Sequence, residues 1–277
     1  MTFAFTLFGT LAASPSVDIF TAADVASCGK IRIPQMTVTP TGILLVAQCR
    51  TANMMSSSGG LDDDQHLSTV VSTFSRDGLT WSPMVTLTAI GYSHGQVVYD
   101  AVRKRVIMQY QRHPSVDPEY NSTLYQLIST DDGATWSEPV DIQGANARCN
   151  PQAPNNMQVG TAGAKIQTSS GRIIFLGHAK GTACRWWTDD GGETYHASDP
   201  YPANEAAIAE VAPSHIYMNA RGGKNPWHGH RTSFWSKDDG KTFTSPTECP
   251  IVDVDCSAGL VAEPHASRAN LSVRAAT

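Results

Sequence analysis

Charged residues that could take part in chemistry are spread over most of the 277-residue chain. The candidates are Arg32, Arg50, Asp64, Glu205, Arg221 and Arg268. Carboxyl groups can give and take protons during catalysis, and a guanidinium group offers paired donors that match the two oxygens of a carboxylate. Taken singly, each residue has an ordinary explanation, because isolated charges are usually solvated on the surface. Their meaning therefore depends on the elements that position them.

A short turn sequence that recurs four times indicates what those elements are. The copies are 75–81, 129–136, 188–195 and 236–243, and their closing aromatic residues are 55, 59 and 48 residues apart. A period of roughly 50 residues is typical of a repeat architecture with one supersecondary unit per period. Asp and Gly at fixed positions predict a turn in which the carboxylate binds its own backbone N–H groups and Gly has positive φ. We expect each closing aromatic side chain to pack in the core between neighbouring units.

Strand-like segments lie between the turns, each short, rich in β-branched or aromatic residues and bounded by Gly, Pro, Asp or Asn. The segments are 42–47, 68–74, 105–110, 123–128, 172–176 and 215–218. No segment has a helical apolar stripe over three turns. The pattern predicts an all-β fold, a β-propeller rather than a β-sandwich, because a sandwich does not naturally produce four in-phase copies of one turn. Residues 144–164 are small and polar, which predicts a long loop between blades.

Further blocks of sequence resemble the sialidase (neuraminidase) superfamily, most closely its lysosomal type. In that family the recurring turns are called Asp boxes. The other matching blocks are Arg-Ile-Pro at 32–34, Thr-Pro-x-Gly-x-Leu-Leu at 39–45, Met-Ser-Ser-Ser at 55–58, Asn-Glu at 204–205, Asn-Ala-Arg at 219–221 and Arg-x-Asn-Leu-x-Val-Arg at 268–274. The resemblance covers roughly residues 30–274. It implies a six-bladed propeller that removes terminal sialic acid from glycans with retention at the anomeric carbon.

The resemblance also implies a role for each candidate residue. Arg32, Arg221 and Arg268 would grip the carboxylate of the sugar, although Arg274 is a nearby competitor for the third position. Asp64, the last of three consecutive acids, would be the general acid/base, and Glu205 would deprotonate a tyrosine nucleophile. Arg50 would support the loop that carries the acids, and Glu210 would be structural. The Asp boxes would be structural too, on turns away from the active face.

The tyrosine nucleophile has no match in this chain. The family carries it beyond the third arginine, and no tyrosine follows Arg268. The segment between Cys256 and Arg268 is also shorter than in the family. We therefore expect about five of six blades, with a truncated C-terminus. Tyr195, Tyr201 and Tyr217 lie in or near predicted strands and are not expected to substitute for the nucleophile.

Composition limits the remaining possibilities. A net charge of −5 with no basic stripe argues against nucleic-acid binding, and no apolar run is long enough to span a membrane. Residues 1–14 are predicted as a possible signal peptide or leader, with the propeller domain over 15–277. Asn121 and Asn270 begin glycosylation motifs. Together these features predict a secreted or lysosomal protein.

Cysteine and histidine spacing gives no metal site. Cys249 and Cys256 are close enough to form a small disulfide loop in an oxidising compartment, although free buried thiols fit equally well. His228 and His230 form the only tempting pair, and we expect them in a surface loop. The proposed mechanism needs no cofactor or metal.

Three functions remain open at this level. The chain is predicted to be an exo-α-sialidase acting on sialylated glycoproteins, oligosaccharides and gangliosides. The alternative is a catalytically inactive propeller that binds sialic acid or another carbohydrate, because the tyrosine is absent. A third possibility is an interaction scaffold, since a fold does not fix a function.

Overall fold

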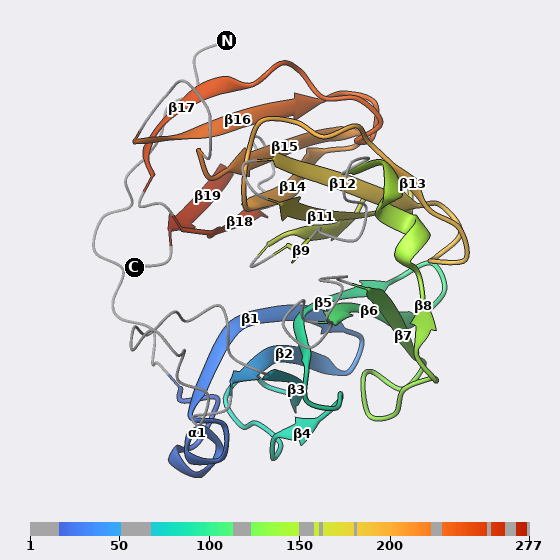
Figure 1. Ribbon diagram of the computed structural model, residues 1–277, viewed down its shortest axis with the longest axis vertical. Helices are drawn as coiled ribbons and strands as arrows, with labels where there is room; N and C mark the ends of the chain where they lie inside the picture. Colours follow the sequence, from blue (N-terminus) through green and yellow to red (C-terminus); the bar gives the residue numbers. More distant parts are fainter. Residues whose placement is uncertain are drawn as a thin grey trace.

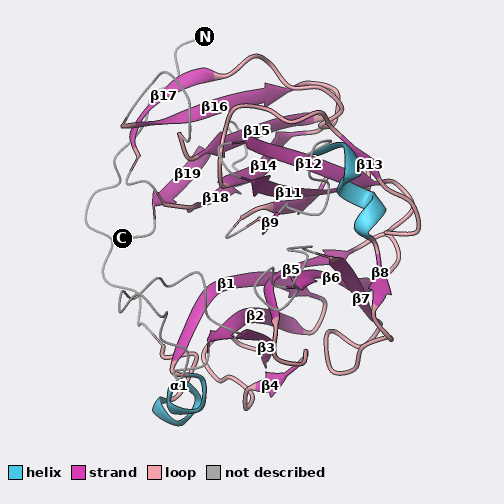
Figure 2. Ribbon diagram, viewed as in Figure 1, coloured by secondary structure: helices cyan, strands magenta, loops and turns pink. Residues whose placement is uncertain are grey.

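The computed structural model describes residues 17–50, 68–112, 123–149, 158–160, 163–179, 182–222, 229–253, 256–263 and 270–275. Within these residues almost all regular structure is antiparallel β-sheet (Figures 1 and 2). We number the sheets 1 to 5 in chain order.

Each sheet is built from strands that are close in the sequence. Sheet 1 contains β1 (Lys30–Thr39), β2 (Gly42–Arg50), β3 (Ser68–Ser75) and β4 (Val85–Thr86). Sheet 2 contains β5 (Tyr92–Asp100), β6 (Arg105–Arg112), β7 (Leu124–Ser129) and β8 (Val140–Asp141). Sheet 3 contains β9 (Gln158–Val159), β10 (Lys165–Gln167), β11 (Ile173–Ala179), β12 (Thr182–Thr188) and β13 (His196–Ala197). Sheet 4 contains β14 (Ala206–Ala212), β15 (His215–Ala220), β16 (His230–Ser236) and β17 (Thr247–Val252), and sheet 5 contains β18 (Ala258–Glu263) and β19 (Asn270–Ala275).

The five sheets follow one another around a common centre (Figure 1). The inner strands β1, β5, β10, β14 and β18 contact one another in that succession. In sheets 1, 2 and 4 the chain then runs outward as a meander, each strand pairing with the next. This radial arrangement is that of a β-propeller and not of two sheets packed face to face. The prediction of an all-β, propeller-like fold is therefore confirmed.

The predicted strands are present as β2, β3, β6, β7, β11 and β15, with ends that differ by a few residues. Among the described residues, two short helical segments accompany them: α1 (Ala22–Cys28) and the 3₁₀ segment η2 (Gln143–Cys149), which is kinked at Asn146. At the start of α1 the Thr21 hydroxyl accepts from the Asp24 N–H at 3.2 Å, and the Asp24 carboxylate accepts from the Thr21 N–H at 2.8 Å. This reciprocal cap fixes the beginning of the helix.

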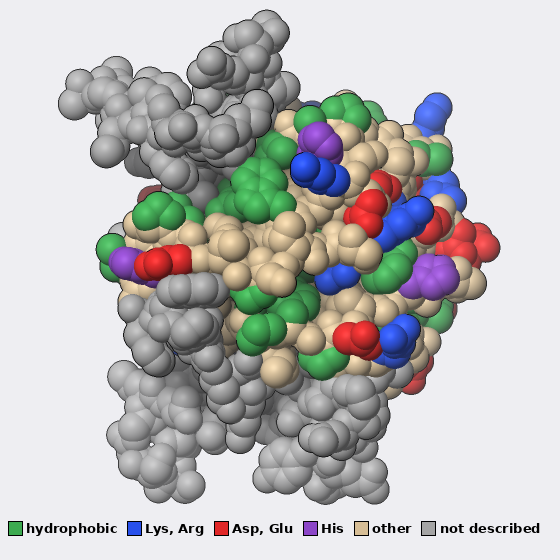
Figure 3. Space-filling model, turned by 90° about the horizontal axis from the view of Figure 1, so that it is seen from above, with side chains coloured by type: hydrophobic (Ala, Val, Ile, Leu, Met, Phe, Trp, Pro, Cys, Tyr) green, Lys and Arg blue, Asp and Glu red, His purple; other side chains and the backbone are tan. Residues whose placement is uncertain are grey.

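Apolar side chains fill the spaces between neighbouring sheets. Between sheets 1 and 2, Leu44 and Val70 pack against Val97 and Met108, and each is at most 1% exposed. Burial of an aliphatic side chain contributes about 1.5–3 kcal/mol. Four of the clusters take residues from two sheets, whereas a fifth joins sheet 1 to α1 and the residues before it. Charged side chains of both signs lie interspersed on the surface seen in Figure 3.

The recurring turns have the predicted geometry, as the third copy illustrates. The Asp190 carboxylate accepts from the backbone N–H groups of Glu193 and Thr194 at 3.0 and 2.9 Å, and from the Thr194 hydroxyl at 2.5 Å. The Gly192 N–H donates to the Thr188 hydroxyl at 2.7 Å, and Gly192 has a φ of 98°. The closing Tyr195 packs into the core between sheets 2 and 3. The predicted hydrogen bonds are therefore confirmed, and the closing aromatic packs between two sheets in the second, third and fourth copies. Trp81 of the first copy packs instead against sheet 1 and α1.

Three of the turns also contact the preceding sheet. The Thr41 hydroxyl of sheet 1 donates to Asp132 in the second turn, and the Ser170 hydroxyl of sheet 3 donates to Asp239 in the fourth at 2.6 Å. Arg103 of sheet 2 donates to the Asp189 carbonyl of the third turn at 3.2 Å. Each donor belongs to the hairpin between the inner strand of its sheet and the next strand: β1 and β2, β5 and β6, or β10 and β11. The turns and hairpins of successive sheets therefore lie on one side of the molecule, which we call the box face.

Two expectations need correction. Residues 144–164 are not one loop: η2 covers the first part, and β9 pairs with β11. Cys149 at the end of η2 is joined to Cys184 of β12 by a disulfide, which ties η2 to sheet 3. A second disulfide joins Cys28 to Cys49.

The suggested Cys249–Cys256 disulfide is not present, and both residues are free thiols. Cys249 lies opposite Arg231 in the sheet, and the Tyr217 hydroxyl is 3.8 Å from its sulfur. Its side chain is thereby held within the sheet 4 packing, so the free-thiol alternative is the correct one.

Candidate active site

The ends of the strands opposite the box face carry the candidate residues of sheets 1 and 4. In sheet 4, Ser236 of the fourth turn pairs with Ile216, whereas Ala220, the neighbour of Arg221, pairs with Thr232 at the other end. In sheet 1, Ser75 of the first turn pairs with Ile43, whereas Arg50 pairs with Ser68 at the other end. We call this side of the molecule the site face. The predicted separation of the Asp boxes from the candidate residues is confirmed for these two sheets.

Glu205 and Arg221 form an ion pair on the site face. Arg221 Nη1 lies 3.0 Å from Glu205 Oε2, and the Arg221 N–H donates to the Glu205 carbonyl at 2.8 Å. The Asn204 amide oxygen accepts from the Glu205 N–H at 2.9 Å. The two side chains are 25% and 14% exposed, so the pair is partly desolvated but still open to solvent. It combines a positive group that can bind an anion with a carboxylate that can accept a proton.

A fully buried arginine supports this pair from within sheet 4. Arg231 is 0% exposed, and its Nε donates to the Asn219 amide oxygen, two residues before Arg221. Its Nη1 lies 3.4 Å from an Asp253 carboxylate oxygen, and the other oxygen of Asp253 accepts from the Gly222 N–H. Arg231 is therefore linked to the Asn219 side chain before Arg221 and, through Asp253, to the backbone N–H of Gly222 after it.

Arg231 carries a buried positive charge, and not all of its N–H groups have a hydrogen-bond acceptor among the described residues. Burial lowers the pKa of its guanidinium group, and the charge of Asp253 partly offsets this. Its Nη1 also donates to the Cys256 carbonyl at 3.1 Å, while Nη2 has no hydrogen-bond partner in the described part of the chain. Removing Asp253 would leave a buried charge without compensation, which is costly.

Sequence reasoning did not identify Arg231, Asn219 or Asp253 as site residues. The signal was weak: an Arg between His-Gly-His and the strand Thr-Ser-Phe-Trp looks like a solvated charge at a strand end. From the sequence, only the neighbouring histidines, His228 and His230, stood out in this region. His230 Nδ1 contacts the Glu248 carboxylate at the surface, and His228 lies outside the described residues.

The two arginines of sheet 1 lie in different environments. Arg32 is exposed on β1, directly before a bulge at which Ile33 has a φ of 54°. Arg50 is only 3% exposed, and its Nε and Nη2 donate to the Gln48 side-chain oxygen at 3.1 and 2.9 Å. Gln48 in turn donates to the Ser68 hydroxyl at 2.9 Å. Arg32 can therefore meet a ligand from solvent, whereas Arg50 is built into the sheet.

The remaining predicted residues divide into two groups. Asp64 and Arg268 lie outside the described residues, so their place in the site stays a prediction. Glu210 accepts from the N–H groups of Ser169 and Ser214 at 2.6 and 3.0 Å. These contacts hold turns on the box side of sheets 3 and 4, which agrees with the structural role expected for Glu210.

Among the described residues, no three His, Cys, Asp or Glu side chains are grouped as metal ligands would be. None of the helices in that part of the chain has the length and apolar character needed to cross a membrane.

The chain and its fold have clear relatives among known proteins. The family of BNR repeat-like domains matches residues 51–270. A protein called sialidase from Bacteroides fragilis (strain YCH46) is 30% identical over 139 residues, covering 48% of this chain and 24% of that protein.

Solved structures give the same result for the fold. The Hadza microbial sialidase Hz136 is similar with a TM-score of 0.71 and 22% identity, over 86% of this chain and 51% of that one. The NanB sialidase from Streptococcus pneumoniae has a TM-score of 0.73 and 12% identity, over 94% of this chain and 58% of that one. This chain thus spans little more than half the length of these structures.

These likenesses, with the four Asp boxes, define a sialidase-type fold, and the predicted resemblance to the sialidase superfamily is confirmed at that level. The chain belongs to the BNR repeat-like domain family.

Proposed function

We propose that this protein is an exo-α-sialidase of the six-bladed type, which hydrolyses terminal sialic acids of glycoconjugates with retention at the anomeric carbon. The observation that supports the proposal best is the Glu205–Arg221 ion pair on the site face. It combines an anion-binding group with a carboxylate, at a place where buried Arg231 and Asp253 restrict the backbone. A half-buried guanidinium binds a carboxylate more strongly than an exposed one, because solvent screens it less.

Each candidate residue has a role in the proposed reaction. Arg32, Arg221 and Arg268 bind the carboxylate of the sugar, which selects an anionic sugar over a neutral one. Asp64 protonates the glycosidic oxygen as its bond to the sugar breaks, and later takes a proton from the attacking water. Arg50, buried at the edge of the site face, supports the loop of Asp64.

Glu205 acts as a base in the proposed reaction. Sialidases use tyrosine rather than a carboxylate as nucleophile, which avoids placing two anions together at the anomeric carbon. An unperturbed phenol titrates near ~10, so a neighbouring carboxylate must accept its proton. The resemblance gives this role to Glu205, and the tyrosine itself is not identified among the residues of this chain.

We further propose that the protein acts in the secretory pathway, in lysosomes or outside the cell. The Cys28–Cys49 and Cys149–Cys184 disulfides support this, because disulfides persist mainly in oxidising compartments. The substrates proposed are sialylated glycoproteins, oligosaccharides and gangliosides.

A fluorogenic α-sialoside at acidic pH tests the proposed activity. We expect the wild type to release the fluorophore, Asp64→Asn to lower the rate about 10²–10⁴-fold, and Arg32→Ala to weaken substrate binding. Arg76→Ala, an exposed arginine in the first Asp box, is the matched control and should behave as the wild type. Binding of sialic acid without release would instead favour a non-catalytic carbohydrate-binding protein, and absence of both would leave an interaction scaffold. Either result would overturn the proposal.

A further inference from the structure

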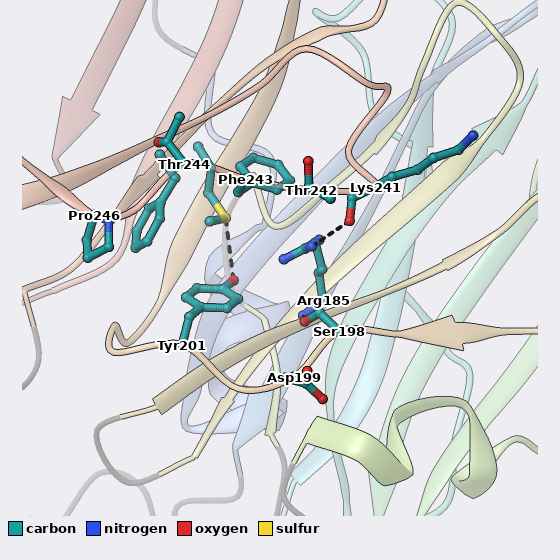
Figure 4. A pocket seen from close by; sticks show the side chains of 11 residues that line it. Arg185, Ser198, Asp199, Tyr201, Lys241, Thr242, Phe243, Thr244 and Pro246 are labelled. Carbon is teal, nitrogen blue, oxygen red and sulfur yellow. Dashed lines mark hydrogen bonds between the residues drawn. The ribbon is translucent and has the colours of Figure 1, made fainter.

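A cavity lies between sheets 3 and 4, separate from the Glu205–Arg221 pair. Its volume is about 280 Å³. Its lining residues come from β12, β15 and β16, from the segment after β13, and from the end of the fourth Asp box and the residues that follow it. They are Arg185, Ser198, Asp199, Tyr201, Met218, Phe234, Lys241, Thr242, Phe243, Thr244 and Pro246 (Figure 4). Arg185 is three residues from Thr188, the first residue of the third Asp box, so the cavity lies toward the box face.

Arg185 brings a buried positive charge to this cavity. It is 8% exposed, and its Nε and Nη2 donate to the carbonyls of Gly240 and Lys241 at 3.1 and 2.9 Å. Its guanidinium carbon lies 4.7 Å from the centre of the Phe243 ring. Within the described residues these partners are neutral, and no ion pair joins Arg185 to a carboxylate. Burial lowers the pKa of the Arg185 guanidinium, and the charges of nearby groups, among them Asp238 and Asp199, offset this only in part.

A buried charge without a counterion is costly, because water no longer solvates it and no opposite charge replaces the water. The two carbonyls occupy Nε and Nη2, and one guanidinium nitrogen points toward Tyr201 (Figure 4). An anion that reached this nitrogen would complete the shell of Arg185. The fixed guanidinium would lose little freedom on binding it.

Tyr201 adds a second donor at the same place. Its hydroxyl donates to the Met218 sulfur at 3.4 Å, and a thioether is only a weak acceptor. Burial raises the pKa of the Tyr201 phenol, so the hydroxyl keeps its proton and can donate it to a ligand oxygen. Tyr201 and Phe234 pack edge to face with their ring centres 5.3 Å apart, which gives the cavity an aromatic floor.

The other charged residues at the rim make no ion pair with Arg185 within the described residues, although the charge of Asp199 acts on it from a distance. Asp199 is 79% exposed and lies 2.8 Å from Arg148, so a cation already balances its charge. Lys241 contributes its carbonyl to Arg185, and its ammonium group extends away from the cavity (Figure 4).

We propose that this cavity is a binding site for a small organic carboxylate. The carboxylate accepts hydrogen bonds from Arg185 and the Tyr201 hydroxyl, and the ring of the ligand packs on the Tyr201–Phe234 floor. An aromatic acid and an acidic monosaccharide share this chemistry. The site is independent of the proposed hydrolysis, which takes place on the site face.

Saturation-transfer NMR with two matched pairs of probes tests the proposal on the full chain. Benzoate is compared with neutral benzamide, and glucuronate with neutral glucose. We expect at least one acid to bind, and its neutral partner to bind at least about tenfold more weakly, because a bond to a charged donor is lost. Binding of benzoate alone identifies an aromatic acid as the ligand class, and binding of glucuronate alone identifies an acidic sugar. If neither acid binds, or if each neutral probe matches its acid, the proposal is overturned.

Variants locate the binding. Tyr201→Phe keeps the aromatic floor and removes only the hydroxyl, so it should weaken the acid about five- to tenfold, and Arg185→Gln should abolish binding. Arg76→Gln is the distant control and should bind as the wild type. Because Arg185 also links sheets 3 and 4, its variant could fail to fold, and Tyr201→Phe then decides. Wild-type affinity in a folded Tyr201→Phe protein would contradict the assignment.

Discussion

At the scale of single residues, the arrangement around Arg221 matters more than Arg221 itself. A long arginine side chain loses conformational freedom when it is held in one position, which costs free energy unless other groups position it first. Here Asn219 and Asp253 connect both sides of Arg221 to buried Arg231. The position of Arg221, the proposed anion-binding group, is therefore restricted before any ligand arrives.

Replacing the buried arginine tests this role. Arg231→Lys keeps the charge but cannot contact Asn219 and Asp253 through one planar fork. We expect the free energy of unfolding to fall by about 2–4 kcal/mol and the Kd for a sialic acid ligand to rise about tenfold. Urea unfolding and calorimetric titration at a temperature where the variant is folded measure the two effects.

The matched control is Arg105→Lys. Arg105 Nη2 donates to the Gly191 carbonyl at 2.7 Å on the box side of sheet 2, whereas Arg221 lies at the opposite, site-face end of sheet 4. Arg105→Lys should lower the free energy of unfolding but leave the Kd for the sialic acid ligand unchanged. If Arg231→Lys behaves in the same way, Arg231 is only structural.

Residue roles could be predicted from the sequence only in part. The block Asn-Glu … Asn-Ala-Arg indicated Glu205 and Arg221, and the structure joins them in an ion pair. Arg231 could not be found, because its burial depends on Asp253, 22 residues away, and on Asn219. The disulfide partners were equally hidden, since Cys149 and Cys184 are 35 residues apart and meet only when sheet 3 is formed.

At the scale of elements, the Asp boxes are small folding units that the sequence specifies almost completely. Asp190, Thr194 and Gly192 lie within five residues, and their hydrogen bonds need no distant partner. This is why the four turns could be predicted. By contrast β14 (Ala206–Ala212) could not be predicted, because its alanines give no strong strand signal. Their small side chains suit the centre of the molecule, where the inner strands approach one another closely.

Removing the carboxylate of one turn should destabilise the protein. We expect Asp190→Ala to lower the free energy of unfolding by about 1–3 kcal/mol at pH 7, because several hydrogen bonds to a charged group are lost. Glu193→Ala is the control, since its exposed side chain lies in the same turn and only its backbone binds Asp190. An equal loss in the two variants would contradict the role of the carboxylate.

The effect of Asp190 should also depend on pH. Burial raises the pKa of its carboxyl group, but the hydrogen bonds from Thr194, Thr188 and Glu193 outweigh burial and hold the pKa well below its usual value. A carboxyl with a lowered folded-state pKa contributes stability above its unfolded pKa, near ~4, and loses that contribution as the pH falls through the folded pKa. The difference between wild type and Asp190→Ala should therefore shrink below about pH 4 in urea unfolding. A difference that stays constant down to pH 2 would show that protonation is not involved.

At the scale of the whole molecule, the contacts between sheets place the candidate residues on one side. Thr41–Asp132, Arg103–Asp189 and Ser170–Asp239 keep successive box turns together. Polar contacts also cross between inner strands: Lys165 of β10 donates to the Gln35 side chain of β1, and burial lowers the pKa of the Lys165 amine to about 8. The ends of sheets 1 and 4 that bear Arg32 and Arg221 consequently face the same way.

The repeat period predicted this radial order, but not how far the sheets would extend around the centre. The spacing of roughly 50 residues reports one blade per turn sequence, and in sheets 1, 2 and 4 the strands follow one another in chain order from the inner strand outward. Sheet 5 has no Asp box among its described residues, so the repeat gave no signal for β18 and β19. They pair over six residues each, and β18 packs beside β14.

Recognition of the sugar carboxylate is the claim on which the proposed function depends, and one calorimetric comparison tests it. The α-methyl glycoside of N-acetylneuraminic acid and the methyl ester of the same glycoside are titrated into the wild type and into Arg221→Met. We predict that the acid binds the wild type at least about tenfold more tightly than the ester, and that Arg221→Met removes this difference. Equal affinity of the wild type for acid and ester, or an unchanged preference in Arg221→Met, would contradict the account.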